Sequence, residues 1–448
     1  MKRFWLVLLS LGLIVAFSTS AMAVDVKFSG EYYAAGLYLD KTKLVKDTGA
    51  DGPSTAFWYQ RLRLTTDFIV SPGLKLVARA DIMERAWGAQ RSDVPLVTSN
   101  DQFSAGTRAE NENIAFDLLY IQYVSPIGIF QVGYQIDGQY GTVFGNNPNP
   151  TPRIFYMLPY KGFLLGLIVG KNTPTIAEQS KTAILAATAA DRDSDFFTAF
   201  LNYKWKTGEA GFLFKYVRSA GNRAVLGGDN GFVTNQYVVT PFAKVQLGPV
   251  AVQTQLYHIF GQAQKFEGTV AGALADTRLN MIYGWVDATA NFGMFYAGGS
   301  VAYVSGNDPG SNASQGAGGG TDYMPCLILF NNELNYWAGA PTGYNGASTG
   351  NQITNAWFGQ VRGGVKPTDK LDIGMSISYA SADKKPAGFL YNDYGYEVDL
   401  TATYKITNNL SYMLGGGYLF TGKYFRGTGD ANSLTNNFLV INKLTLTF

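Results

Sequence analysis

The feature that most constrains this chain is a series of two-faced strands joined alternately by short and long connections. Runs of about 10 residues, in which apolar and polar side chains alternate, recur along the chain. Eight short connections separate them in pairs, at residues 71–73, 125–128, 159–162, 207–209, 248–249, 292–293, 366–370 and 407–409. Eight short and nine long connections require eighteen strands. The pattern predicts an all-β, transmembrane antiparallel β-barrel with short periplasmic turns and long extracellular loops.

Two of the candidate strands are weaker than the rest. They cover residues 153–158 and 353–365, where the alternation is interrupted. If neither forms a strand, the barrel has sixteen strands, which is still an even number.

One hairpin shows how the two faces are built. Leu62 lies on the apolar face of its strand and Arg63 on the polar face. If Val70 pairs with Leu74 across the turn, Arg63 lies opposite Asp81 on the neighbouring strand. A soluble β-sandwich would bury the apolar face and expose these charges, and local alternation does not exclude that alternative.

The two ends of the chain favour the membrane barrel. Lys2 and Arg3 precede an apolar run at 4–17 and a small-residue cleavage site at 21–23, as in a secretory signal peptide. We therefore expect removal of residues 1–23, export through the Sec pathway to the outer membrane of a Gram-negative cell, and a single barrel domain at 24–448.

The last strand ends in the aromatic residue Phe448, a candidate signal for the barrel-assembly machinery. If Phe448 points outward, alternation also turns Asn442 toward lipid, and a bulge near Asn442 would remove this conflict.

Charge excludes a basic nucleic-acid-binding surface. The chain holds 35 Lys and Arg against 33 Asp and Glu, and two of the basic residues lie in the leader. The mature chain is thus neutral, which also argues against a pore lined by charges of one sign.

A barrel of sixteen to eighteen strands is wide enough to hold water. By strand parity, the candidate pore-lining residues are Arg61, Arg63, Asp67, Lys75, Arg79, Asp81, Lys215, Lys244, Arg362, Glu397, Asp399 and Lys405. The basic residues of the first hairpin and the acidic pair Glu397 and Asp399 lie near the closure of the barrel, where they could create a field across the pore. Alternatively, the lumen charges pair with one another to satisfy a polar interior.

Three long connections, 84–113, 171–194 and 306–352, could narrow the pore. Residues 175–190 of the second have helical composition. The third is rich in Gly, Asn and Ser and is interpreted as a flexible external loop.

No catalytic residues, metal ligands or cofactors are predicted. His258 shares the apolar parity of its strand, with no acidic residue on that strand to orient it. Cys326, the single cysteine, is interpreted as a loop residue rather than a ligand or nucleophile.

Several segments resemble the homotrimeric porin family of sulfate- and metal-reducing bacteria and, more distantly, the alginate-export barrel family. They are residues 57–64, 67–70, 120–124, 305–309, 395–400 and 415–420. Membership would imply a closed barrel of sixteen or eighteen strands, possible trimers and conduction of small hydrophilic solutes.

The sequence therefore predicts a passive porin for ions and small hydrophilic solutes, with outer-membrane lipid as its main partner. Two alternatives stay open. One is a substrate-dedicated channel, such as an exporter of anionic polysaccharide, which needs a continuous Arg and Lys ladder. The other is a barrel sheath that surrounds a periplasmic electron carrier.

Overall fold

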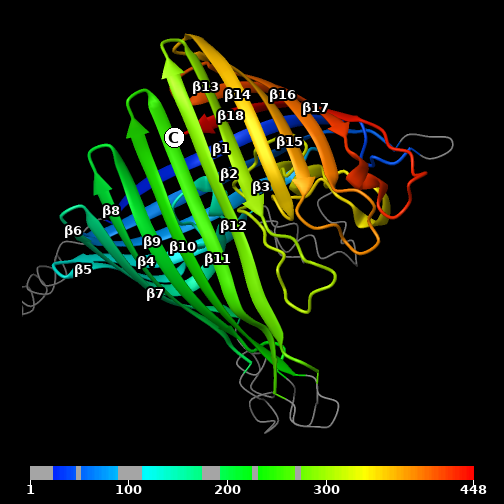
Figure 1. The fold of residues 1–448 in the computed structure, drawn as a ribbon. Helices are drawn as coiled ribbons and strands as arrows, with labels where there is room; N and C mark the ends of the chain where they lie inside the picture. The colour runs from blue at the N-terminus through cyan, green and yellow to red at the C-terminus, as the bar shows by residue number, and fades with distance from the viewer. Residues whose placement is uncertain (1–23, 47–51, 89–113, 174–191, 224–230, 268–273) are drawn as a thin grey trace, which may run out of the picture.

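A computed structural model describes residues 24–46, 52–88, 114–173, 192–223, 231–267 and 274–448. These residues form one antiparallel sheet of eighteen strands, in which each strand pairs with the next along the chain (Figure 1). The strands are β1 (Asp25–Leu39), β2 (Thr55–Ser71), β3 (Leu74–Ala86), β4 (Ile114–Ser125), β5 (Gly128–Asp137), β6 (Asn149–Tyr160), β7 (Phe163–Thr173), β8 (Ser194–Trp205), β9 (Gly208–Ser219), β10 (Phe232–Leu247), β11 (Val250–Phe266), β12 (Thr277–Phe292), β13 (Phe295–Val304), β14 (Ala356–Thr368), β15 (Leu371–Ala382), β16 (Asp393–Lys405), β17 (Leu410–Thr421) and β18 (Asn437–Thr447).

The sheet closes on itself through its first and last strands. β1 pairs with β18 from Glu31 opposite Thr447 to Leu39 opposite Leu439. Beyond this register, Gly30 and Phe448 exchange two backbone hydrogen bonds of 2.9 and 3.0 Å. The chain terminus thus forms part of the seam, and the described sheet has no free edge strand.

The alternation of short and long connections is confirmed. Each of the eight predicted short connections joins two consecutive strands. In Figure 1 the tight turns between the green strands lie at the upper left, and long loops lie at the opposite end. The two weak segments form β6 and most of β14, so the count is eighteen and not sixteen. We call the two ends of the barrel the turn end and the loop end.

The register of the first hairpin is as predicted, but its turn is not. Arg63 does lie opposite Asp81. At the turn, however, Ser71 pairs with Leu74, and the register shifts between Ile69 and Ser71. The predicted pairing of Val70 with Leu74 is therefore wrong, because a two-residue turn and a local bulge replace the three-residue turn.

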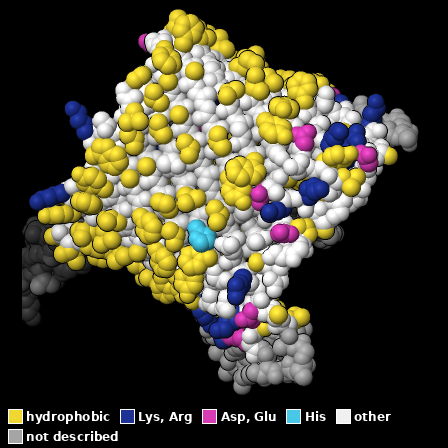
Figure 2. Space-filling view, in the orientation of Figure 1, with side chains coloured by type: hydrophobic (Ala, Val, Ile, Leu, Met, Phe, Trp, Pro, Cys, Tyr) yellow, Lys and Arg dark blue, Asp and Glu magenta, His cyan; other side chains and the backbone are white. Residues whose placement is uncertain are grey.

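The outer surface of the barrel is apolar. Alternate strand residues such as Phe116, Leu400 and Val361 expose 71%, 57% and 64% of their surface. Figure 2 shows hydrophobic side chains spread over the strands that face the viewer, with Lys, Arg, Asp and Glu mostly toward the strand ends. This surface overturns the soluble sandwich alternative, which would have buried these side chains.

A few polar residues lie on the described outer face. His258, the cyan side chain in Figure 2, forms a 3.0 Å hydrogen bond with Asn280 of the neighbouring strand. Asn442 points outward, and no bulge turns it away from lipid, since β18 pairs without a register shift on both sides. Its amide donates a long hydrogen bond, 3.4 Å, to the Gly36 carbonyl, and the missing side chain of Gly36 leaves room for this approach.

Among the described residues, no helix is long and apolar enough to cross a bilayer.

The outer face of β12 allows a test of how deep each of its residues lies in the membrane. Val286 lies near the middle of an outward apolar run between Asn280 and Phe292. We expect Val286→Arg to lower the free energy of unfolding by about 2–4 kcal/mol, whereas Phe292→Arg at the strand end costs about 0–1 kcal/mol. Denaturant titration in phospholipid vesicles measures both values. Equal losses for the two variants would contradict a lipid-facing wall.

Candidate functional site

Two connections from the loop end fold into the barrel. One is residues 138–148, here called the short inner loop, with a 3₁₀ turn η2 (Val143–Gly145). The other is residues 305–355, here called the long inner loop, with helix α4 (Asn332–Ala338) and a 3₁₀ turn η3 (Tyr344–Gly346). Ile328 and Leu329 are fully buried, and Phe330 is 1% exposed. The prediction of a flexible external loop for 306–352 is therefore wrong, because apolar residues within this Gly-rich segment pack against the barrel wall.

Buried carboxylates of β16 bind the backbone of the long inner loop. The two oxygens of Glu397 accept hydrogen bonds from the Ile328 and Leu329 N–H groups at 2.6 and 2.8 Å. On the neighbouring strand β14, Gln360 donates to the Pro325 carbonyl at 2.7 Å. These contacts satisfy loop groups that would otherwise be buried without partners.

Helix α4 attaches the same loop to the opposite side of the closure seam. The Asn331 side chain caps the helix by accepting from the Leu334 N–H at 2.8 Å. Glu333 accepts a hydrogen bond from the Tyr59 hydroxyl at 3.2 Å and forms a 2.9 Å ion pair with Lys443. Trp337 stacks on Tyr59, with ring centroids 4.4 Å apart. The loop therefore bridges β16, β2 and β18.

An aromatic cluster joins the two inner loops. Phe144, at the tip of the short inner loop, is fully buried and stacks on Trp285 of β12, with ring centroids 5.7 Å apart. Tyr323 of the long inner loop contacts both rings. The Phe144 carbonyl also accepts a 2.7 Å hydrogen bond from the Gly320 N–H. Both loops thus pack as one body against the inside of the wall.

Most of the predicted pore-lining charges face the interior and form ion pairs. Arg63 binds Asp81 through two hydrogen bonds of 2.7 and 2.5 Å, as their opposed register requires. Other pairs between wall residues include Arg61 with Glu84, Lys75 with Asp67, Arg79 with Asp117, Arg153 and Lys215 with Asp137, Lys244 with Glu209, Arg362 with Asp287, and Lys366 with Asp372. This arrangement matches the second interpretation made from the sequence, in which the interior charges neutralise one another.

The acidic pair predicted to line the pore is covered instead. Glu397 is fully buried and Asp399 is 5% exposed, because the long inner loop packs over both. They cannot create the field across the pore that was proposed from strand order. Lys405 has the same strand parity but lies exposed at the turn end.

The long inner loop carries one carboxylate toward the basic side of the interior. Burial raises the pKa of Asp322, while Gln139, Asn146 and the nearby positive charge of Arg63 oppose that rise. Asp322 therefore lies against Gln139 and Asn146 of the short inner loop, within electrostatic reach of Arg63.

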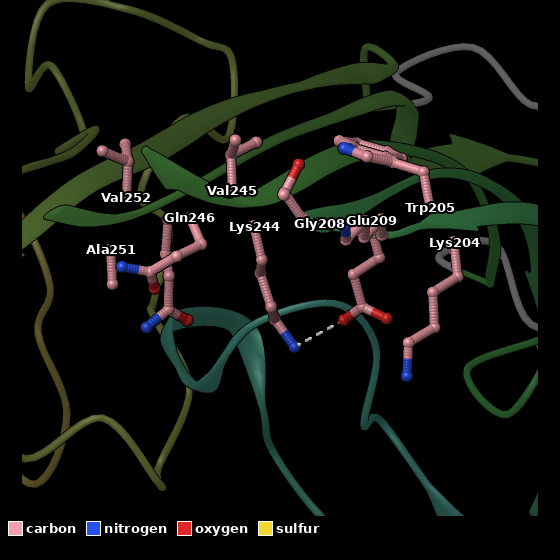
Figure 3. Close-up of a pocket in the computed structure, with 12 residues that line it drawn as sticks. Lys204, Trp205, Gly208, Glu209, Lys244, Val245, Gln246, Ala251 and Val252 are labelled. Atoms are coloured by element: carbon pink, nitrogen blue, oxygen red, sulfur yellow. Dashed lines mark ion pairs between the residues drawn. The ribbon is translucent and has the colours of Figure 1, made fainter. Parts of the chain in front are cut away.

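At the turn end, β8 to β11 surround an open cavity of about 410 Å³ (Figure 3). Lys204, Glu209 and Lys244 point to one side of the sheet, whereas Trp205 and Val245 point to the other. Lys244 and Glu209 form a 3.0 Å ion pair. The same two-faced alternation therefore reaches the last residues of these strands, with the charged face inside.

Sequence reasoning missed the acidic partners that neutralise the wall. Asp117 and Asp137 pair with Arg79, Arg153 and Lys215, but they lie near strand ends, where parity is hardest to assign. Glu333 was missed because it lies in the loop. Its position after a helix-capping Asn331 was the available signal. Most of the predicted inner connections 84–113 and 171–194, including the candidate helix at 175–190, lies outside the described residues.

No family model matches the chain, and no curated protein matches it by sequence. Solved structures do match its fold. OccK2 (OpdF) of Pseudomonas aeruginosa shares 10% identity and a TM-score of 0.51, over 95% of this chain and 98% of that one. OccK8 (OprE) of the same organism shares 12% identity and a TM-score of 0.50, over 95% of this chain and 98% of that one. The outer membrane channel DcaP of Acinetobacter baumannii shares 11% identity and a TM-score of 0.45, over 96% of this chain and 99% of that one. The first two matches show that this chain has the fold of those barrels.

The aromatic cluster predicts how firmly the inner loops are held. Phe144→Ala removes a fully buried ring between both loops, so we expect a loss of about 3–5 kcal/mol in the free energy of unfolding and faster proteolysis of the long inner loop. Phe116→Ala, on the outer wall, is the matched control and should leave proteolysis unchanged. Denaturant titration and limited proteolysis measure the two effects. A long inner loop that stays equally protected in Phe144→Ala would contradict this packing.

Proposed function

We propose that this protein is a passive outer-membrane channel for ions and small hydrophilic solutes. The observation that carries the proposal is a closed barrel of eighteen strands with an apolar outside and a charged, polar inside. A barrel of this size leaves an aqueous interior even when loops occupy part of it. The fold shared with OccK2 and OccK8 supports the same reading.

The inner loops define where the channel is narrow. They pack against the interior of β10 to β18 and of β1 and the loop-end part of β2, whereas the paired charges Arg63 with Asp81 and Lys75 with Asp67 lie farther along β2 and β3. Asp322 approaches from the loop side, near Arg63. Solutes would therefore pass between this loop body and a wall of ion pairs, and no chemical step is required of the protein.

The two alternative functions fit less well. An exporter of a polyanion needs unpaired cations along its path, but Arg61, Arg63, Lys75, Arg79 and Arg153 of the wall pair with carboxylates. A sheath for an electron carrier needs a free interior, but the long inner loop occupies part of it.

Single-channel recording tests the proposal directly. We expect the refolded mature protein to insert into a planar bilayer and give a steady, ohmic conductance that rises with salt concentration, because passive flow through water has no saturable step. Barrels that insert but do not conduct would overturn it and favour the sheath or a dedicated exporter.

The ion pair between Arg63 and Asp81 predicts how wall charges control the choice between anions and cations. Asp81→Asn leaves the Arg63 charge unbalanced and should shift the reversal potential in a salt gradient toward anion selectivity. Arg63→Gln leaves Asp81 unbalanced and should shift it about equally toward cation selectivity. Each variant changes the charge by one unit at the same place. Shifts of the same sign, or none, would place this pair outside the ion path.

A further inference from the structure

Beneath the long inner loop lies a cluster of three donor groups without a balancing charge. The Cys326 thiol and the Glu397 and Asp399 carboxylates place donor atoms within 4.8 Å of one another, and all three side chains are buried. In the part of the chain that the structure describes, no Lys or Arg forms an ion pair with either carboxylate. The nearby Arg362 is bound to Asp287 at 2.7 Å.

The hydrogen bonds around this cluster leave one atom unsatisfied. Glu397 uses its two oxygens for the Ile328 and Leu329 N–H groups. Asp399 accepts a long hydrogen bond, 3.3 Å, from Ser376 through Oδ2 and lies against the Leu327 N–H and the Glu397 carboxyl group, whereas its buried Oδ1 has no well-formed hydrogen bond. Two adjacent buried carboxylates are unstable without a proton or a cation between them, so the orphaned oxygen points to a missing positive group.

The cluster is accessible from inside the barrel. A cavity of about 360 Å³ adjoins it, and Cys326, Ser376 and Asp399 contribute to its lining. Other lining residues, such as Gly374 and Thr401, lie toward the turn end of their strands. A small ion could therefore reach the cluster from the water-filled interior, and a water molecule could complete its coordination.

We propose that Cys326, Glu397 and Asp399 bind a divalent transition-metal ion of the zinc class, which fastens the long inner loop to β16. A thiolate excludes the hard ions Ca²⁺ and Mg²⁺, whereas thiolate and carboxylate together are an accepted donor set for Zn²⁺. In tetrahedral Zn²⁺ sites, donor atoms are roughly 3.5 Å apart, so the side chains must draw together slightly. Binding releases the thiol proton.

A bound divalent ion leaves the buried cluster with only a small net charge. The Cys326 thiol lies buried beside two carboxylates, so its thiolate form needs a cation next to it. A divalent ion reduces the charge of three anionic donors from −3 to −1. The Ile328 and Leu329 N–H groups, which already donate to Glu397, offset part of the remainder.

Cobalt provides a direct test, because a thiolate bound to Co²⁺ gives a charge-transfer absorption band. The refolded mature barrel, freed of metal by a chelator, is titrated with Co²⁺ and then with Zn²⁺. We expect one ion per chain, a thiolate band, loss of that band when Zn²⁺ replaces Co²⁺, and slower proteolysis of the long inner loop with Zn²⁺ bound.

Two variants and one control complete the design. Cys326→Ser should abolish the thiolate band, and both Cys326→Ser and Asp399→Asn should weaken Zn²⁺ binding about 10-fold or more. Asp308→Asn, an exposed carboxylate in the same loop, should bind as the unchanged protein does. A folded, unchanged barrel that takes up no Co²⁺ or Zn²⁺ at this stoichiometry would overturn the proposal. The two carboxyl groups would then share a proton instead. Equal Zn²⁺ affinity in Cys326→Ser would overturn it as well.

Discussion

Closure of the sheet between β1 and β18 is the constraint on which the rest of this structure depends. In a bilayer, backbone N–H and C=O groups find no water, so an open edge would leave a row of unsatisfied groups. The register from Glu31 opposite Thr447, together with the exchange between Gly30 and Phe448, removes that edge. Closure then gives every strand an outside and an inside, and the two-residue period assigns each side chain to one of them.

The inside of the barrel follows a second rule, which is neutrality at short range. Arg63 with Asp81 and Lys75 with Asp67 are ion pairs between neighbouring strands, formed where the register places opposite charges together. Because each wall pair is close to neutral, the interior is polar and hydrated without a strong field of one sign. Such an interior suits passage of small solutes better than capture of one highly charged polymer.

The inner loops convert the wide interior into a narrower one, and they are held by chemistry that the open wall lacks. Buried rings such as Phe144 and Trp285 supply packing, and Glu397 satisfies the loop backbone. This arrangement places Asp399 and Cys326 side by side in a buried position. A charged side chain on the open wall keeps its water, whereas one beneath the loop loses it at a large cost in free energy. A cation is therefore most needed beneath the loop.

The sequence by itself determined the short connections and the assignment of residues such as Arg63 and His258 to opposite faces, because alternation and turn residues are local signals. It also determined that Arg63 lies opposite Asp81 on the neighbouring strand, because that pairing follows from counting residues on either side of one short turn. The choice of eighteen strands over sixteen needed the observed pairing of β6 and β14. Only the tertiary structure decided that residues 305–355 fold inward, that Glu397 lies beneath them and that Asp117 neutralises Arg79. These contacts join residues distant in sequence or near irregular strand ends, where a period of two carries no information about the partner.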